Sequence, residues 1–283
     1  MSAQIKYAII GAGIMGEAIV AGLLRTGLAL PENIRFYEPR RERCVELQDK
    51  YHILPAESNR EAVNDVDVVL LSVKPQVMDR VLSDLRNQIP AGALVMSIVA
   101  GASIETISAG LKHSSIIRCM PNTPAQIGEG ITVWTASKDV KPEQLELGKS
   151  ILCAFGQEVF VDDEHYLDMA TALSGSGPAY IFLFLEAMID AGVHLGFSRH
   201  IAQKLVIQTM RGSVNYFESK KEHPAHLRNE VTSPGGTSAA ALYYLEKAGI
   251  RTAISRAIWA AYERSQELGR GKKVQIPDKN NPE

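Results

Sequence analysis

The sequence has few of the features that mark secreted, disulfide-bonded or membrane-spanning chains. Its three cysteines, Cys44, Cys119 and Cys153, are widely spaced and odd in number, which argues against a disulfide framework and against a zinc site. Its apolar runs, such as residues 66–73, are far too short to cross a bilayer. The N-terminal residues lack the basic and apolar regions of a secretory signal. We therefore expect a soluble, cytoplasmic protein.

An excess of charge of either sign is also missing. The 30 Lys and Arg residues nearly balance the 32 Asp and Glu residues, and the formal net charge is −2. Such a balance offers no basic surface for nucleic acid or for an anionic membrane, so neither is expected as a partner. Of the 283 residues, 46% are hydrophobic, which is enough for a sizeable core and for two domains.

A glycine motif stands near the start of the chain. Residues 5–10 read as a short buried strand, and Gly11, Gly13 and Gly16 follow it directly, before a helical pattern. Glycines also collect in ordinary turns, but a G-x-G-x-x-G motif between a strand and a helix favours a dinucleotide site. The first glycine allows a tight turn, the second lets the backbone approach a pyrophosphate, and the third lets the helix pack on the strand.

Strand and helix patterns alternate up to residue 163. The first five candidate strands are nearly continuous apolar runs, as in parallel strands buried on both faces. Amphipathic helices are predicted between strands, for example over residues 40–50 and 76–88. The alternation predicts an α/β fold with a Rossmann-type doubly wound sheet, whose later strands form an edge of different topology. The candidate strands are residues 5–10, 34–37, 66–73, 94–99, 116–120, 131–135 and 158–161.

From residue 164 onwards the strand patterns stop and helical patterns take over. A long apolar helix includes Ile181 and Leu195, and further helices are predicted over residues 199–217, from Ser238, and through Ile258. Several helix faces carry few polar residues, so this half should bury surface against a second copy of the chain. We predict a dinucleotide-binding domain at residues 1–163, an all-α dimerisation and substrate domain at 164–268, and a mobile tail at 269–283.

Ligands of a doubly wound sheet bind at the carboxyl ends of its strands. In this chain those ends carry small, polar or proline residues, which also serve as ordinary helix caps. Lys74 is different, because a cation at a strand end that faces a cofactor cleft favours a functional role. For residues 120–124, Met-Pro-Asn-Thr-Pro, capping and function are equally good explanations.

Two runs of small residues lie in the helical half, at residues 172–180 and 231–238. Each is predicted to open a helix, so that backbone N–H groups at the helix N-terminus, with hydroxyls beside them, could bind a carboxylate. A helix cap or a close helix crossing is the more ordinary explanation of either run taken alone.

Taken together, five motifs resemble those of pyrroline-5-carboxylate reductase, the family that makes proline in its last biosynthetic step. They are residues 11–16, 72–76, 120–124, 174–180 and 232–236, and they occur in the family's order. The resemblance implies a small cyclic imine carboxylate as the substrate and NADPH or NADH as the cofactor. It also implies a homo-oligomer that is at least a dimer, in which a loop from the neighbouring subunit completes each active site.

The resemblance also implies which residues line each ligand. The substrate would be surrounded by Ser174, Gly175, Ser176, Gly177, Ser233, Gly235, Gly236, Thr237 and Ser238, and the chemistry of a C=N bond favours the hydroxyls of Ser238, then Ser174 or Ser176, as catalytic partners of the nitrogen. The cofactor would be lined by Ile10, Gly11, Gly13, Ile14, Met15, Glu38, Asn59, Ser72, Val73, Lys74, Pro75, Ile98, Val99 and Ala100, to which their positions add Gly16 and Arg40.

Two positions deserve separate treatment. Ser238 stands where the family has threonine, which keeps the hydroxyl and removes a methyl group. Glu38, about 20 positions after Gly16, is placed to accept hydrogen bonds from the adenosine ribose, and its charge would repel a 2′-phosphate. Arg40 or Arg41 could clamp that phosphate instead. We expect both cofactors to work, with NADH used at least as well as NADPH.

Two other functions fit parts of the sequence. A β-hydroxyacid-type dehydrogenase would need a catalytic lysine soon after the substrate loop, and none occurs between Gly177 and Lys204. A non-catalytic dinucleotide-sensing protein would keep the glycine motif but would not need two small-residue runs. The seven histidines fall outside every motif, so we expect them to be surface or structural groups, and no metal is expected.

Overall fold

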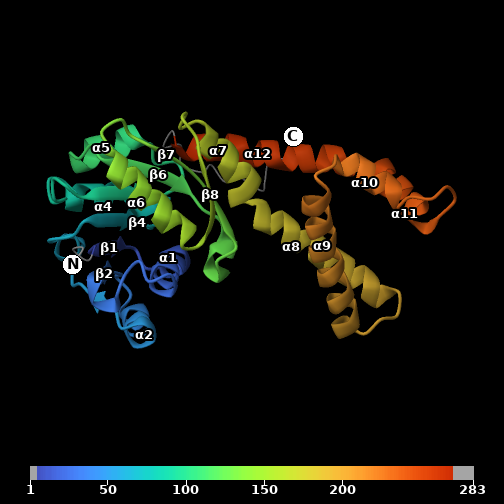
Figure 1. The fold of residues 1–283 in the computed structure, drawn as a ribbon, viewed down its shortest axis with the longest axis horizontal. Coiled ribbons are helices and arrows are strands. Elements are labelled where there is room, and N and C mark those ends of the chain that lie inside the picture. The colour runs from blue at the N-terminus through green and yellow to red at the C-terminus, as the bar shows by residue number, and fades with distance from the viewer. Residues whose placement is uncertain (1–4, 270–283) are drawn as a thin grey trace, which may run out of the picture. The chain divides into compact units, whose positions relative to one another are not determined.

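The computed structural model describes residues 5–269, which form two compact units (Figure 1). Residues 5–176 and 260–269 make up one unit, here called the sheet unit, and residues 177–259 make up the helical unit. The predicted domain boundaries after residues 163 and 268 stay predictions. By their contacts, residues 164–176 and 260–269 group with the sheet unit. The predicted mobile tail lies outside the described residues, except for Gly269.

An eight-stranded sheet forms the centre of the sheet unit. Its strand order is β3-β2-β1-β4-β5-β6-β7-β8, and all neighbours are parallel except β6 and β7. The crossover from β3 to β4 confirms the doubly wound α/β fold, and the antiparallel pair confirms the different topology of the last strands. The short strand β3 was not predicted. The strands are β1 (Tyr7–Ile10), β2 (Ile34–Tyr37), β3 (Leu54–Pro55), β4 (Val68–Leu71), β5 (Leu94–Ser97), β6 (Ile116–Met120), β7 (Gly130–Ala136) and β8 (Gly156–Phe160).

Both faces of the sheet are buried at strands β1, β4, β5 and β6, because successive side chains of a strand point to opposite faces and helices cover each face. Tyr7 and Ile9 pack in one cluster with residues of α1 and α6, whereas Ala8 and Ile10 pack in another with residues of α4 and α5. This explains why the strands read as continuous apolar runs. The helices between the strands are α1 (Ile14–Arg25), α2 (Arg41–Tyr51), α3 (Asn59–Ala62), α4 (Met78–Leu85), α5 (Ile104–Leu111) and α6 (Pro142–Cys153), with 3₁₀ turns at Pro31–Asn33, Pro75–Val77 and Thr123–Ile127.

The long apolar helix begins earlier than the sequence suggested. Helix α7 (Tyr166–Ala170) continues through a π turn at Thr171–Gly175 into α8 (Gly177–His194). The Ser176 N–H donates to the Thr171 carbonyl at 2.8 Å, which is the five-residue spacing of a π turn. The prediction that residues 172–180 open a helix with free N–H groups is therefore wrong, because the preceding helical turns accept these hydrogen bonds.

This helix also has the length and composition of a membrane-spanning segment. An 18-residue window within residues 166–194 reaches a mean hydropathy of 1.4, and very little of this window is buried. Polar and small residues interrupt its apolar runs. Each uninterrupted run is therefore too short to indicate a membrane span, and the sequence did not predict one. An exposed apolar surface of this kind marks a site of contact with another protein chain or with a membrane.

The end of α12 (Ile250–Gly269) packs against α7 within the sheet unit. The Ser265 hydroxyl donates to Asp168 at 2.9 Å, and the Tyr262 hydroxyl lies 2.8 Å from His165 Nε2. Arg118, which is buried in β6, pairs with Glu164 at 2.8 Å just before α7. These contacts explain why residues 260–269 group with the sheet unit, and they give His165 a structural role.

The helical unit, by contrast, has little core of its own. Residues 177–259 are all described, and their buried apolar side chains are Ala202, Val206 and Leu227 alone. The predicted helices are confirmed in α9 (Arg199–Lys220), α11 (Thr237–Lys247) and α12, whereas the short α10 (Pro224–Glu230) was not predicted. Helices α8 and α9 lie side by side (Figure 1), with Gly192 allowing a close approach to Ala202.

Candidate active site

The carboxyl ends of β1, β2, β4 and β5 meet at one edge of the sheet. Backbone hydrogen bonds link them: the Gly11 N–H donates to the Tyr37 carbonyl at 3.0 Å, and the Ser72 N–H donates to the Ile10 carbonyl at 2.9 Å. The Ile98 N–H donates to the Leu71 carbonyl at 3.0 Å. The fold therefore brings together the predicted cofactor stretches at residues 10–16, 38–40, 72–75 and 98–100.

The three glycines of the motif have three different surroundings. Gly11 has a φ of +87°, which favours glycine, and a Cβ there would lie 2.6 Å from Val73 Cγ1. A Cβ on Gly16 would overlap the Gly11 carbonyl oxygen and lie 2.9 Å from Ser72 Oγ, so this glycine allows α1 to pack on the loop. A Cβ on Gly13 would meet no described atom within 4 Å. Gly13 is also the N-cap of α1 and offers no side-chain cap, so the loop fits the phosphates of a dinucleotide.

Two residues after β4 are placed differently. The Ser72 hydroxyl donates to the Gly11 carbonyl, which ties β4 to the glycine loop. Lys74 is exposed at the start of the 3₁₀ turn and makes no ion pair with any residue from 5 to 269. Ser72 thus shapes the loop, while the charge of Lys74 is available to a ligand.

Glu38 and Arg40, which the sequence suggested as opposing influences on cofactor choice, bind each other. Glu38 is only 7% exposed, and its Oε1 accepts from the Arg40 side chain at 2.7 Å and from the Arg40 backbone N–H at 3.2 Å. Hydrogen bonding and charge attraction from Glu38 raise the pKa of Arg40. The Cys44 thiol donates to the Glu38 carbonyl at 3.0 Å, and burial raises the pKa of this thiol.

Asn59 is buried at the start of α3, which packs against β1 and β2. Its Nδ2 donates to Asp84 at 3.1 Å. Its Oδ1 is buried and has no hydrogen-bond partner within the described part of the chain. A buried amide oxygen without a donor is unfavourable, so a ligand hydroxyl at this position would be stabilising.

Glu17 and Arg43, to which the sequence assigned no role, lie beside the glycine loop. Arg43 Nε donates to the Ala12 carbonyl at 3.2 Å, and the same guanidinium pairs with Glu17. Glu17 also accepts hydrogen bonds from Lys50 and Tyr51, each at 2.9 Å. No motif marks this network, because α1 and α2 meet only in the folded chain.

The Met-Pro-Asn-Thr-Pro stretch at residues 120–124 is hydrogen-bonded to a second motif, the small-residue run that contains Ser174. Asn122 begins the 3₁₀ turn, but its side chain does not cap that turn. Its Oδ1 accepts from the Ile131 N–H at 3.0 Å, and its Nδ2 donates to the Ser174 carbonyl at 3.2 Å. Asn122 therefore positions the Ser174 segment, and the residues after it form a turn, while a functional role of residues 120–124 stays a prediction.

The candidate catalytic serines of the π turn differ in availability. The Ser174 hydroxyl donates to the Ala170 carbonyl at 3.0 Å, one helical turn back. The Ser176 hydroxyl makes no hydrogen bond with the residues that the structure describes. Gly175 lies against Met120, which places the turn next to the end of β6. Ser176 is therefore the freer of the two hydroxyls.

The second small-residue run does open a helix, as predicted. Gly235 has a φ of +72°, and Gly236 is the N-cap of α11 without a side-chain cap. The Gly236 N–H is used internally, since it donates to the Ser233 carbonyl at 3.0 Å. The N–H groups of Thr237 and Ser238 thus stay the predicted anion-binding groups at this helix start, and the Ser238 hydroxyl beside them makes no hydrogen bond with residues 5–269.

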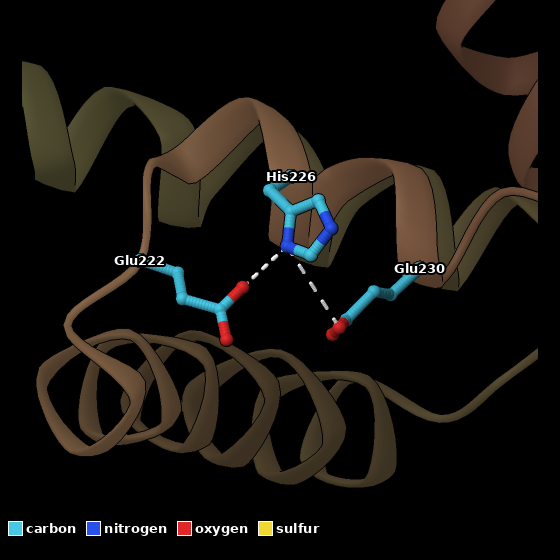
Figure 2. Close-up of side chains that lie close together, drawn as sticks. All are labelled: Glu222, His226 and Glu230. Carbon is cyan, nitrogen blue, oxygen red and sulfur yellow. Dashed lines mark hydrogen bonds and ion pairs between the residues drawn. The ribbon is translucent and has the colours of Figure 1, made fainter.

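One group of side chains in the helical unit has the composition of a metal site. Figure 2 shows His226 between Glu222 and Glu230. One ligand atom from each of the three lies within 4.8 Å of the others. The Nδ1 atom of His226 is hydrogen-bonded to Glu222 and lies 4.0 Å from a Glu230 oxygen. The side chains are largely exposed and lie along α10, from just before its first residue to its last, so the arrangement is that of an ordinary surface hydrogen-bonded group.

Comparison with family models finds two matches. Residues 6–101 match the model described as NADP oxidoreductase, coenzyme F420-dependent, which covers the glycine loop, Glu38 and Lys74. Residues 164–268 match the model described as pyrroline-5-carboxylate reductase dimerisation, which covers both small-residue runs.

Relatives match over almost the whole chain. The chain is 47% identical over 270 residues to the pyrroline-5-carboxylate reductase of Synechocystis sp., covering 94% of this chain and 99% of that one. It is 38% identical to the reductase of Escherichia coli K12, covering 94% and 98%. Among solved structures it is similar to Plasmodium falciparum pyrroline carboxylate reductase with NADP bound, with 32% identity, a TM-score of 0.87 and coverage of 94% and 98%.

Proposed function

The chain belongs to the pyrroline-5-carboxylate reductase family, and we propose that it reduces 1-pyrroline-5-carboxylate to L-proline with NADPH or NADH, the last step of proline biosynthesis. The observation that carries this proposal is the N-terminus of α11, where two backbone N–H groups and the Ser238 hydroxyl are available to a small carboxylate beside a polar nitrogen. Neither the β-hydroxyacid dehydrogenase nor the non-catalytic sensor is favoured by the relatives.

In this proposal different residues hold the cofactor and the substrate. A bound nicotinamide cofactor supplies the hydride that reduces the C=N carbon. The glycine loop would hold the pyrophosphate at the N-terminus of α1, and Glu38 and Asn59 would accept hydrogen bonds from ribose hydroxyls. The reacting carbons must come within about 3–3.5 Å of each other, which requires that both ligands are held rigidly.

The substrate is oriented by the helical residues. The N–H groups of Thr237 and Ser238 bind the carboxylate, which selects the ring face that receives the hydride. The Ser238 hydroxyl hydrogen-bonds to the ring nitrogen, with Ser176 as the second choice because the Ser174 hydroxyl is engaged. The imine nitrogen is basic enough to take its proton from water, so no histidine is required.

The apolar surface of the helical unit supports the assembly. We propose that residues 164–268 form a homodimer, in which each subunit completes the substrate site of the other. Covering by a second subunit accounts for the exposed side chains of α8 without a membrane. The cytoplasmic location expected from composition stays a prediction.

A steady-state assay tests the proposed reaction directly. Oxidation of NADPH and NADH is followed with 1-pyrroline-5-carboxylate, and proline is measured as the product. Gly13→Asp is a suitable control, because the structure has room for its Cβ while its charge would oppose the pyrophosphate. The variant should fold and lose turnover. If the wild-type protein turns over neither cofactor, the reductase proposal is wrong.

Cofactor preference depends, in our proposal, on Glu38. Its carboxylate is buried beside the ribose position, and Arg40 is already paired with it, which supports use of NADH at least as well as NADPH. Removing the carboxylate in Glu38→Ser should release Arg40 and shift kcat/KM towards NADPH. A tenfold or larger preference of the wild type for NADPH, or an unchanged ratio in the variant, would exclude Glu38 as the discriminating residue.

A further inference from the structure

The guanidinium of Arg43 holds the glycine loop from the side of α2. Three of its nitrogens are used: Nε donates to the Ala12 carbonyl at 3.2 Å, Nη1 pairs with Glu46 at 2.7 Å, and Nη2 pairs with Glu17. The side chain is only 14% exposed. Each side-chain nitrogen of Arg43 therefore already has a protein partner, and the guanidinium is poorly placed to contact a ligand phosphate itself.

The bond to Ala12 determines how the next peptide group is oriented. In a trans peptide the carbonyl and the N–H point in opposite directions. Since the Ala12 carbonyl points to Arg43, the N–H of Gly13 points away from Arg43. Gly13 is the N-cap of α1, where the surrounding space is open and a pyrophosphate would lie.

This peptide group needs an external restraint. Ala12 is flanked by Gly11 and Gly13, and glycine adopts many backbone conformations at little cost. A rotated Ala12–Gly13 peptide would turn a carbonyl oxygen towards the negatively charged phosphates. The hydrogen bond from Arg43 disfavours that rotation, because it would leave a buried donor without its acceptor.

Glu17 keeps Arg43 in place. Burial by itself would raise the pKa of Glu17, but hydrogen bonds from Lys50, Arg43 and Tyr51 outweigh it and lower the pKa to about 2. Glu17 is therefore ionised at any pH at which the protein works. It belongs to α1, the helix whose N-terminus follows the loop, so the network fixes α1, α2 and the loop together.

We propose that Arg43 is a positioning residue for the cofactor: anchored by Glu17, it holds the Ala12–Gly13 peptide with its N–H directed at the pyrophosphate. The inference rests on the proposed use of a nicotinamide dinucleotide. It concerns the pyrophosphate alone and makes no demand on the substrate imine.

Ligand fragments separate this role from a general structural one. The dissociation constants of ADP-ribose, which contains the pyrophosphate, and of adenosine 2′-monophosphate, which lacks it, are measured by calorimetry for the wild type and for Arg43→Gln. We expect ADP-ribose, NADH and NADPH to bind about tenfold more weakly to the variant, as for loss of one oriented hydrogen bond to a charged group. Binding of adenosine 2′-monophosphate should stay within twofold. The KM for the imine should also be unchanged when the cofactor is saturating.

Matched variants complete the test. Arg80→Gln removes an exposed arginine from α4, and so an equal charge, without touching the loop, and should leave ADP-ribose binding unchanged. Glu17→Gln should weaken ADP-ribose binding as Arg43→Gln does, and the double variant should lose no more than the larger single loss. If Arg43→Gln does not fold, ADP-ribose binding by Glu17→Gln tests the proposal instead. Unchanged ADP-ribose binding in the folded variants, or an equal loss for both fragments, would overturn the proposal, whatever the outcome of the reductase assay.

Discussion

The sheet unit and the helical unit bury their apolar residues to very different degrees. In the sheet unit, Ile9, Ile10 and Leu71 are completely buried, and two clusters fill the faces of the sheet. In the helical unit, α8 has no buried residue, and Leu183 is 65% exposed. Both have apolar sequences, so apolar composition does not by itself tell whether a segment is covered by its own chain.

The difference follows from how each unit can pack. A parallel sheet is covered on both faces by the helices that connect its strands, so its core is closed by the same chain. A helix that is apolar on most sides needs neighbours on most sides. The other helices of the helical unit do not cover α8 on most sides. The match to a dimerisation domain explains this exposure, because a second subunit would cover α8.

The largest expected effect comes from charging the exposed apolar surface. Phe182→Asp combined with Leu183→Asp should separate the subunits and abolish turnover, because burying unpaired charge costs several kcal/mol. Val45→Asp, at an apolar position of α2 with comparable exposure, should leave the assembly intact. Sedimentation velocity measures the oligomeric state of both variants. An unchanged oligomer in the doubly charged variant would mean that the covered surface lies elsewhere.

Truncating a core side chain of the sheet unit should have the next largest effect, which is a loss of folding stability. Phe155 is completely buried, and Phe155→Ala should lower the free energy of unfolding by about 3–5 kcal/mol. Phe160→Ala, at a half-exposed ring that contacts Trp134 edge to face, should cost about 1 kcal/mol. Urea unfolding is followed by Trp134 fluorescence in a Trp259→Phe background, so that the signal reports the sheet unit. Equal losses in the two variants would contradict the closed core.

Acid stability should depend on the sheet unit. The pKa of Glu17 is lowered from 4.5 to about 2, so its contribution is complete above pH 4.5 and is lost as the pH falls towards 2. This contribution is on the order of 3 kcal/mol. Glu17→Gln should therefore flatten the fall in stability over that range. Glu246→Gln removes an exposed, solvent-screened partner of Arg251 in the helical unit and should leave the slope as it is.

The smallest expected effect is on kcat, and it distinguishes the serines of the two small-residue runs. Ser238→Ala should lower kcat about tenfold, or about 1.4 kcal/mol, because it removes a free hydroxyl from the substrate nitrogen. Ser174→Ala should change kcat less, since that hydroxyl is bonded to Ala170. The oligomer and cofactor binding should be unchanged in both. The reverse order of the two losses would move the catalytic hydroxyl to Ser174.

Local sequence was a good guide where one segment determines its own structure. The strands at residues 34–37 and 116–120 were predicted to the residue, and the glycine loop lies between β1 and α1 as expected. The run before α11 opens a helix, because Gly235 and Gly236 end the preceding turn. The run at residues 172–180 was misplaced, since its small residues form a π turn within a helix that had already begun.

What the sequence alone determined is the order of its elements, the doubly wound class and the motifs that carry the family resemblance, since these depend on periodicity and on glycine and proline at particular positions. Only the tertiary structure decided which groups meet across the chain. It paired Glu38 with Arg40, joined Asn122 to Ser174, and set Arg43 against the Ala12 carbonyl. The last two contacts join residues from elements far apart in sequence, and even the neighbouring Glu38 and Arg40 could have faced apart. Such distances depend on the packing of whole helices and strands, which no local pattern contains.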